Sequence, residues 1–194
     1  MTEKDAAFPE VGISSVVIER AVPEDAEAIC AIRDQARLET YPNPEQGISE
    51  ADIRMIIQGP HGEFVPRRIA YYREEIAKSA NSKFGILVAK SEGNVVGFTH
   101  PETDDKGRRT IGDMFVAPEA QGKGIGGKLM DQALDVLGHD EDIYLDVVSY
   151  NSKAIGFYEH YGFEKTDAAI PREEGRPSYL KSLPQIEMVR KGQS

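Results

Sequence analysis

Four glycines within six positions constrain this chain more than any other feature. The segment at residues 111–128 reads IGDMFVAPEAQGKGIGGK and predicts a strand, a turn at Pro118 and then a helix. The glycines at the helix start are Gly122, Gly124, Gly126 and Gly127. Backbone N–H groups in a first helical turn have no partner within the helix, and the helix dipole adds partial positive charge there. Without side chains to cover them, these amides predict a site for a phosphate or pyrophosphate.

Two familiar phosphate-binding motifs fit this segment only in part. Residues 122–128 have the P-loop spacing G-x-x-x-x-G-K, but Leu129 stands where a Ser or Thr should hold magnesium. This departure argues against a nucleotide hydrolase. Residues 122–127 also have the dinucleotide spacing G-x-G-x-x-G. The turn at 118–121 is longer than the tight strand-to-helix turn that a dinucleotide site needs.

A third motif, Q-x-x-G-x-G at residues 121–126, follows Val116-Ala117-Pro118 and fits without a departure. It resembles the acyl-CoA-binding signature of the GNAT superfamily of N-acetyltransferases. A second match lies downstream, where N-x-x-A-x-x-F-Y at 151–158 precedes Tyr161-Gly162-Phe163. Two motifs in the family's order make the resemblance more specific than either alone. A glycine-rich helix start used only for close packing stays open as the alternative.

Composition excludes several classes of function. The 194 residues carry a net charge of −10 and no basic run, which argues against a nucleic-acid partner and suits a cationic substrate. Cys30 is the single cysteine, so neither an intrachain disulfide nor a cysteine metal site is expected. The N-terminus lacks a signal-peptide pattern, and no apolar run approaches the roughly 18 residues of a membrane span. We therefore expect a cytoplasmic protein with no membrane partner.

Periodicity predicts the fold class. Helical patterns run from 23 to about 38, from 49 to 57 and from 66 to 79, and strand patterns cover 84–89, 95–99 and 109–116. A glycine-rich helix, a strand at 143–150, a helix from Asn151 and a closing strand pair follow. This order predicts an α/β (α+β) fold: one mixed, mostly antiparallel twisted sheet of about six or seven strands with helices on both faces. The helical crossover makes strands 109–116 and 143–150 parallel neighbours.

The resemblance implies how such a fold would bind acetyl-CoA. Residues 1–12 would be an N-terminal arm and 13–194 a single acetyltransferase domain. The two parallel strands would splay into a V that takes the pantetheine arm, while amides near Gly124 would bind the pyrophosphate. Lys123 and Lys128 would add charge, or would be solvated surface lysines. The expected cofactor-binding residues are Phe115, Val116, Gln121, Gly122, Lys123, Gly124, Ile125, Gly126, Gly127, Lys128, Asn151 and Tyr158.

The resemblance also implies a reaction, in which an amine attacks the acetyl thioester directly in a ternary complex. A backbone N–H near Val116 would stabilise the developing oxyanion. Tyr158 would protonate the leaving thiolate, unless it is a core aromatic with a satisfied hydroxyl. Thr110 stands where the family often places a glutamate base. We therefore expect deprotonation through water, with Asp113 or Glu39 as helpers.

The acceptor is expected to be a primary amine of a small molecule, peptide or protein. By resemblance, Glu39 and Tyr41 at the end of the first helix and the loop at 171–183 would select it. No grouping of His, Cys and carboxylates predicts a metal site, and a homodimer is common in the family. A non-catalytic acyl-CoA-binding regulatory module on the same fold stays open as the alternative.

Overall fold

The computed structural model describes residues 16–168, 170 and 183–193. The expected arm at 1–12 and nearly all of the expected acceptor loop at 171–183 lie outside the described residues. The described helices are α1 (Ala26–Thr40), α2 (Glu50–Gln58), α3 (Phe64–Ser79), α4 (Ile125–Leu137) and α5 (Ser152–His160). The described strands are β1 (Val16–Arg20), β2 (Leu87–Ser91), β3 (Asn94–Thr103), β4 (Arg109–Val116), β5 (Ile143–Val148), β6 (Glu164–Lys165) and β7 (Gln185–Arg190).

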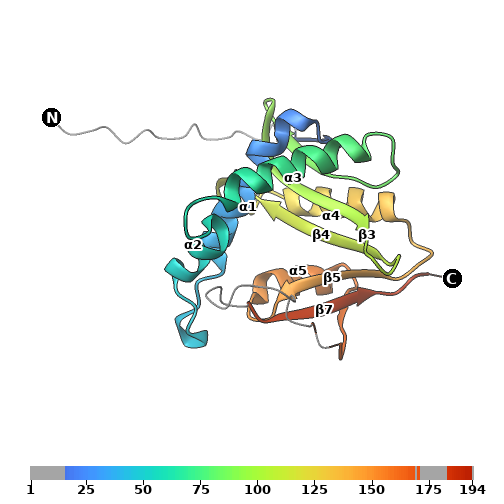
Figure 1. Cartoon of the computed structure of the whole chain (residues 1–194). Coiled ribbons are helices and arrows are strands. Elements are labelled where there is room, and N and C mark those ends of the chain that lie inside the picture. The colour runs from blue at the N-terminus through green and yellow to red at the C-terminus, as the bar shows by residue number, and fades with distance from the viewer. Residues whose placement is uncertain (1–15, 169, 171–182, 194) are drawn as a thin grey trace.

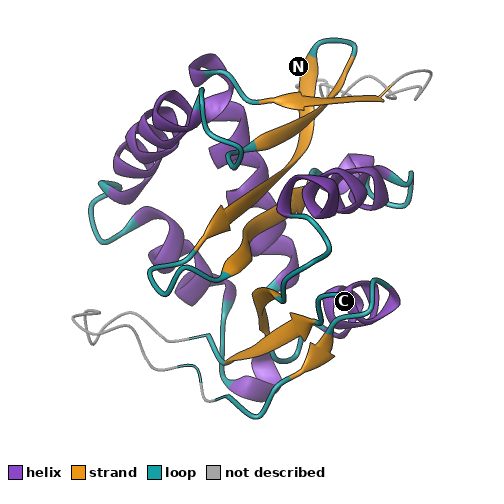
Figure 2. Ribbon diagram, turned by 90° about the vertical axis from the view of Figure 1, so that its right-hand side faces the viewer, coloured by secondary structure: helices purple, strands orange, loops and turns teal. Residues whose placement is uncertain are grey.

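These strands form one seven-stranded sheet in the order β1-β2-β3-β4-β5-β7-β6. Every neighbouring pair is antiparallel except β4 and β5, which are parallel. Helices cover both faces of the sheet, as Figure 2 shows. The predicted fold class is therefore confirmed, including the mixed sheet and the parallel pair that the glycine-rich crossover produces.

The parallel pair separates soon after it forms. The register joins Arg109 with Ile143 and Thr110 with Tyr144, and no pair follows along either strand. Figure 1 shows the two ribbons moving apart toward their C-terminal ends. Backbone groups of β4 beyond Thr110 therefore have no strand partner on this edge, which confirms the predicted splay.

A β-bulge interrupts β4 in the same region. Thr99 of β3 lies opposite Met114, and Pro101 lies opposite Ile111, so that Gly112 and Asp113 together oppose a single residue of β3. Ile111 packs in the core beside α4 and β5. Asp113, within the bulge, contacts α3 on the other face. The bulge thus decides which way Asp113 projects.

The core has two main parts, one on each side of the separated strands. The first buries α1, α3, β2 and β3 against the start of α4. The second buries the rest of α4 against β5, α5 and β7. Cys30 is buried in the first part, as its apolar helical pattern predicts. Among the described helices, none is both long enough and apolar enough to cross a membrane.

Several boundaries differ from those expected. Strand β2 begins at Leu87 and not at Phe84, because Gly85 has φ +149° and pairs instead with the Pro101 carbonyl. Strand β3 continues to Thr103, and β5 ends at Val148. Helix α4 begins at Ile125, so that two of the four glycines precede it and two lie in its first turn.

Candidate active site

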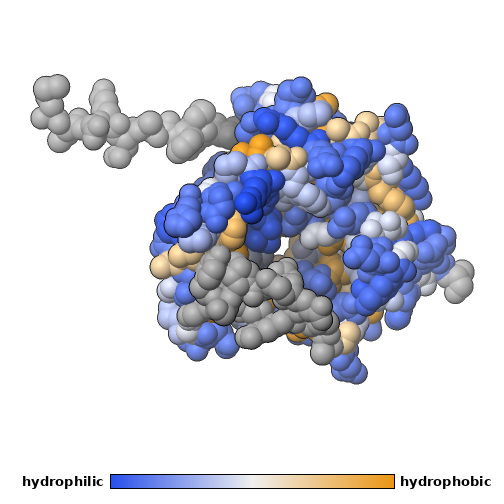
Figure 3. Space-filling view, in the orientation of Figure 1, coloured by the Kyte–Doolittle hydropathy of each residue, from blue (hydrophilic) through white to orange (hydrophobic). Residues whose placement is uncertain are grey.

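A cavity of about 480 Å³ lies between the separated ends of β4 and β5. Its lining comes from the last turn of α1, from β4, the glycine turn, α4, β5 and α5. Figure 3 shows a hollow in this face, with hydrophobic residues inside and hydrophilic residues around it. Most expected site residues line the cavity: Tyr41, Asp113, Phe115, Val116, Gln121, Gly122, Gly124, Ile125, Gly126, Gly127, Asn151 and Tyr158.

The glycine turn presents open backbone to this cavity. Gly122 and Gly124 have φ values of +74° and +76°, which side chains rarely adopt. A Cβ added at either position would meet nothing within 4 Å. Close packing therefore does not account for these two glycines. Their lack of side chains leaves the N–H groups at the start of α4 uncovered at one end of the cavity.

The unpaired edge of β4 forms a second wall. Phe115 and Val116 pair with β3 through Phe98 and Gly97, and their strand has no partner on the β5 side at this level. The Val116 carbonyl accepts a hydrogen bond of 3.3 Å from Gln121 Nε2. An exposed strand edge of this kind can pair with the amides of an extended ligand.

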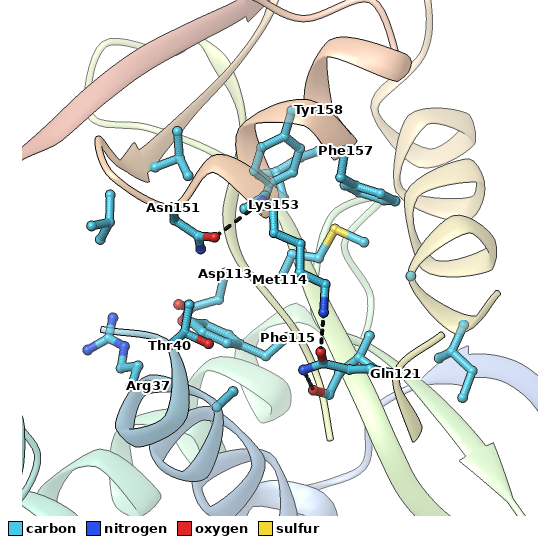
Figure 4. A pocket seen from close by; sticks show the side chains of 18 of the residues that line it. Arg37, Thr40, Asp113, Met114, Phe115, Gln121, Asn151, Lys153, Phe157 and Tyr158 are labelled. Carbon is cyan, nitrogen blue, oxygen red and sulfur yellow. Dashed lines mark hydrogen bonds between the residues drawn. The ribbon is translucent and has the colours of Figure 1, made fainter. Parts of the chain in front are cut away.

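A lysine on α5 reaches the glycine turn from the opposite side. Lys153 Nζ donates a hydrogen bond of 2.7 Å to Gln121 Oε1, as Figure 4 shows. Lys153 lines the cavity, whereas Lys123 and Lys128 are exposed and do not. Lys153 was not predicted as a site residue, because it occupies an unspecified position of the motif at 151–158. Its position two residues after the expected helix cap, Asn151, is the one sequence feature that could have indicated it.

Helix α5 carries two of the expected residues. Asn151 caps it, because its Oδ1 accepts a hydrogen bond of 3.1 Å from the Ala154 N–H, and Asn151 also lines the cavity. Tyr158 is partly buried, with Phe157 and Phe163 packed against its ring edge to face. Among the described residues, none hydrogen-bonds to the Tyr158 hydroxyl. This observation argues against a core tyrosine with a satisfied hydroxyl.

The electrostatics of Tyr158 keep it protonated. Burial raises the pKa of its phenol, and the nearby Tyr41 and Asp113 raise that pKa further. A phenol with a raised pKa is a proton donor near neutral pH and does not persist as the phenolate.

Asp113 and Tyr41 lie on the α1 side of the cavity, as expected. Asp113 Oδ2 accepts a hydrogen bond of 2.9 Å from the Tyr72 hydroxyl, and Arg33 Nε lies 3.6 Å from Oδ1. Glu39 lies elsewhere: it is exposed on α1, accepts a hydrogen bond of 3.3 Å from Gln35, and does not line the cavity. The structure therefore brings one of the two suggested carboxylate helpers to the cavity.

Other polar residues of this wall were not expected. Arg37 and Thr40 line the cavity from the last turns of α1. Helical periodicity alone does not reveal which polar residues of α1 face β4. His100 is buried beside Glu102, and no group of three or more His, Cys, Asp or Glu in the described part of the chain could hold a metal ion.

Comparison with known proteins agrees with this geometry. The family model described as "Acetyltransferase (GNAT) family" matches residues 51–163, which is more than half of the chain. Uncharacterized N-acetyltransferase YhfO of Bacillus subtilis is 33% identical over 96 residues, covering 46% of this chain and 64% of its own. Peptidyl-lysine N-acetyltransferase YiaC of Escherichia coli is 35% identical over 81 residues, covering 42% and 53%. The chain thus spans less than two thirds of either relative.

Solved structures share the fold over nearly the whole chain. The PaiA N-acetyltransferase of Thermoplasma acidophilum, crystallised with coenzyme A, superposes with a TM-score of 0.71 at 22% identity, covering 91% of this chain and 99% of its own. YncA of Salmonella typhimurium, a putative acetyltransferase solved with acetyl-CoA, gives 0.63 at 21% identity, covering 93% and 96%.

Proposed function

The chain belongs to the GNAT acetyltransferase family, and from this premise we propose that it transfers an acetyl group from acetyl-CoA to a primary amine. One observation carries the proposal. A single cavity is lined by the uncovered amides of the glycine turn, by the unpaired edge of β4 and by Tyr158, whose hydroxyl has no hydrogen-bond partner among the described residues. The amides can bind a diphosphate, the strand edge can pair with an extended arm that carries amides, and the hydroxyl can donate a proton to the sulfur of a reacting thioester.

The residues fit coenzyme A in sequence along the cavity. The N–H groups at the start of α4 would bind the diphosphate, and Lys153 would add a positive charge beside them. Backbone groups of Phe115 and Val116 would pair with the pantetheine amides. Bound acetyl-CoA supplies the acetyl thioester. The neighbouring proteins solved with coenzyme A or acetyl-CoA support this assignment.

The chain's own residues would then serve direct transfer. A backbone N–H near Val116 stabilises negative charge on the carbonyl oxygen, and removing one such donor typically costs about 10²–10³-fold in rate. Tyr158 donates its proton to the departing sulfur and regains one from solvent. Asp113 lines the cavity, where the incoming amine would lie, and accepts a hydrogen bond from the Tyr72 hydroxyl. Deprotonation of the amine passes through water.

Ligand binding and turnover test this proposal separately. The full chain is heated with acetyl-CoA, ATP or NAD, and the melting temperatures are compared. Of the three ligands, only acetyl-CoA is expected to raise the melting temperature. At least one member of a panel of primary amines is then expected to cause the release of free thiol from acetyl-CoA. Stabilisation by ATP alone would refute the proposal. If acetyl-CoA stabilises the chain but no amine causes the release of free thiol from it, the result would favour a non-catalytic acyl-CoA-binding module.

A further inference from the structure

The α1 wall of the cavity contains a guanidinium that forms no ion pair with a carboxylate of the described residues. Arg37 lies in the last turn of α1 and lines the cavity. Its Cζ lies 5.8 Å from the ring centroids of both Tyr41 and Phe115. These aromatic contacts stabilise the positive charge. The ring faces do not accept N–H groups in the plane of the guanidinium, and the Tyr41 hydroxyl interacts with only part of the five that an arginine presents.

Not all of those donors have an acceptor in the part of the chain that the structure describes. The Nε of Arg37 is buried and has no hydrogen-bond partner. In the described part of the chain, no carboxylate lies within ion-pair distance of Arg37. A buried donor without an acceptor costs about 1–3 kcal/mol, and more when it is charged. Desolvation lowers the pKa of Arg37, and the charge of Arg33 lowers that pKa further.

The surrounding charges leave one positive charge in excess. Arg68 forms an ion pair with Asp34 at 2.6 Å. Arg33 lies 3.6 Å from Asp113 and 3.7 Å from Asp34. Three guanidinium groups thus share two carboxylates, and both carboxylates are closer to the other two arginines. The wall is complementary to an anion, although the whole chain carries a net charge of −10.

We propose that the acceptor is a small amine that also carries a carboxylate, and that Arg37 binds this carboxylate. This inference rests on the proposed acetyl transfer and names its substrate class. A guanidinium matches a carboxylate through two parallel N–H···O bonds. Figure 4 shows Arg37 and Gln121 on opposite sides of the cavity, with Asp113 beside Arg37. The ammonium of such a ligand lies toward Asp113, and its carboxylate lies toward Arg37.

Other amines complement this wall less well. A polyamine places only positive charge against Arg37, and a lysine side chain in a protein has no adjacent carboxylate. A free amino acid, or a similar small amino carboxylate, satisfies both Arg37 and Asp113. The carboxylate of such a ligand then offsets the excess positive charge at Arg37, while its ammonium faces the Asp113 carboxylate.

The test compares each amino acid with its own carboxamide, which keeps the amine and removes the anion. We expect kcat/KM for the acids to exceed that for the amides by roughly ten- to a hundredfold, as one charged hydrogen-bonded pair supplies. Arg37→Gln should remove this preference, mainly through KM, and leave the acetyl-CoA melting shift unchanged. Arg37→Lys should restore only part of the preference. Arg54→Gln, on the exposed face of α2, is the matched control.

Distinct results overturn the two proposals. Amides that react as well as acids, or an Arg37→Gln variant that loses both equally, would refute the carboxylate site but keep the transferase. Absence of thiol release from every amine would refute the transferase. In that case, equilibrium binding of amino acids and amides in the presence of coenzyme A decides on the site. Binding of the acids alone would support it, and binding of neither or of both would refute it.

Discussion

The hydroxyl of Tyr72 on α3 donates a hydrogen bond of 2.9 Å to Oδ2 of Asp113, within the bulge in β4. Tyr72 is only 1% exposed, whereas Asp113 reaches the cavity wall. Arg33 lies on the other carboxylate oxygen at 3.6 Å. A hydrogen bond to one oxygen and an ion-pair contact at the other restrain the direction of this carboxylate, which makes α3 part of the support for the acceptor side.

Replacing Tyr72 by Phe should therefore affect both stability and turnover. The change removes one hydrogen bond to a charged group without creating a cavity, so unfolding in urea should show a loss of about 1–2 kcal/mol. We expect kcat/KM for the amine to fall several-fold, while acetyl-CoA affinity is kept. Tyr71→Phe, on the neighbouring exposed position of α3, is the control and should change neither. Equal turnover in the two variants would exclude a supporting role for Tyr72.

Tyr158→Phe tests the proposed proton donor. The ring contacts with Phe157 and Phe163 do not use the hydroxyl, so the fold and the acetyl-CoA melting shift should be unchanged. Loss of a positioned general acid typically costs 10²–10⁴-fold, and we expect kcat to fall by at least about 10²-fold. Tyr161→Phe is the matched control, because Tyr161 does not line the cavity and its hydroxyl donates a hydrogen bond of 3.4 Å to the Gly127 carbonyl. An unchanged kcat in Tyr158→Phe would show that Tyr158 is not the proton donor.

Lys153→Met tests which lysine serves the diphosphate. Lys153 lies against Gln121 in the cavity, and Lys128 is exposed outside it. We expect Lys153→Met to weaken acetyl-CoA binding several-fold at low salt, and less at 1 M salt, where the Debye length is about 3 Å. Lys128→Met should bind like the wild type. Titration calorimetry at both salt concentrations measures the affinity of each variant for acetyl-CoA. A larger loss of affinity in Lys128→Met than in Lys153→Met would support the sequence-based expectation that Lys128 adds charge at the diphosphate.

Local sequence signals are sufficient to predict most of the fold. Period-two runs, glycine stops and the glycine-rich crossover predict the element order and the parallel pair β4–β5, and the structure confirms both. The predicted start of β2 was wrong because Gly85 has a positive φ and lies so close to Ser79 of α3 that a side chain at this position would meet it, and neither fact has a local sequence signal. The placement of β7 between β5 and β6 depends on pairing across the sheet, which has no local signature.

The candidate site divides in the same way. The proposed cofactor side lies in two short motifs, so most residues that line it could be named from the sequence, although Lys153 was not among them and the predicted Lys123 and Lys128 do not line the cavity. The acceptor side is assembled from α1, α3 and a bulge. Whether Asp113 faces the cavity depends on the bulge, and the importance of Arg37 depends on which carboxylates lie near it in space. Strand alternation and helical periodicity predict neither the direction of Asp113 nor the carboxylates that surround Arg37.

Gly126→Ala separates helix stability from cofactor binding. A Cβ at this position meets Phe157 at 3.7 Å and Val116 at 3.9 Å, which are ordinary contacts, so folding tolerates it. Alanine favours a helix over glycine by about 0.5–1 kcal/mol, and stability should be unchanged or slightly raised. The methyl group nevertheless enters the cavity lining, and acetyl-CoA affinity should fall at least about tenfold, as one lost or blocked amide contact costs. Gly156→Ala, in α5 with nothing within 4 Å, should gain stability and keep its affinity.

Glu102 on β3 makes stability depend on pH. Its carboxylate occupies the space that a side chain at Gly112 would fill, and His100 Nδ1 lies 3.7 Å away. Burial, followed by the charges of Asp113 and Glu75, raises the pKa of Glu102 to about 7. The folded chain therefore holds this proton more tightly than the unfolded chain does. Stability from this group is fully present below about pH 4.5 and is lost as the pH rises to about 7.

Glu102→Gln removes this dependence, since glutamine resembles the protonated acid. The variant should match the wild type near pH 4.5 and exceed it in free energy of unfolding at pH 8, with the difference growing between the two. Urea unfolding at several pH values measures this difference. Asp105→Asn removes the same charge at an exposed position of the neighbouring turn and should give a flat difference. A Glu102→Gln variant that loses stability at pH 8 would mean that the ionised carboxylate is held by favourable contacts, with the opposite sign.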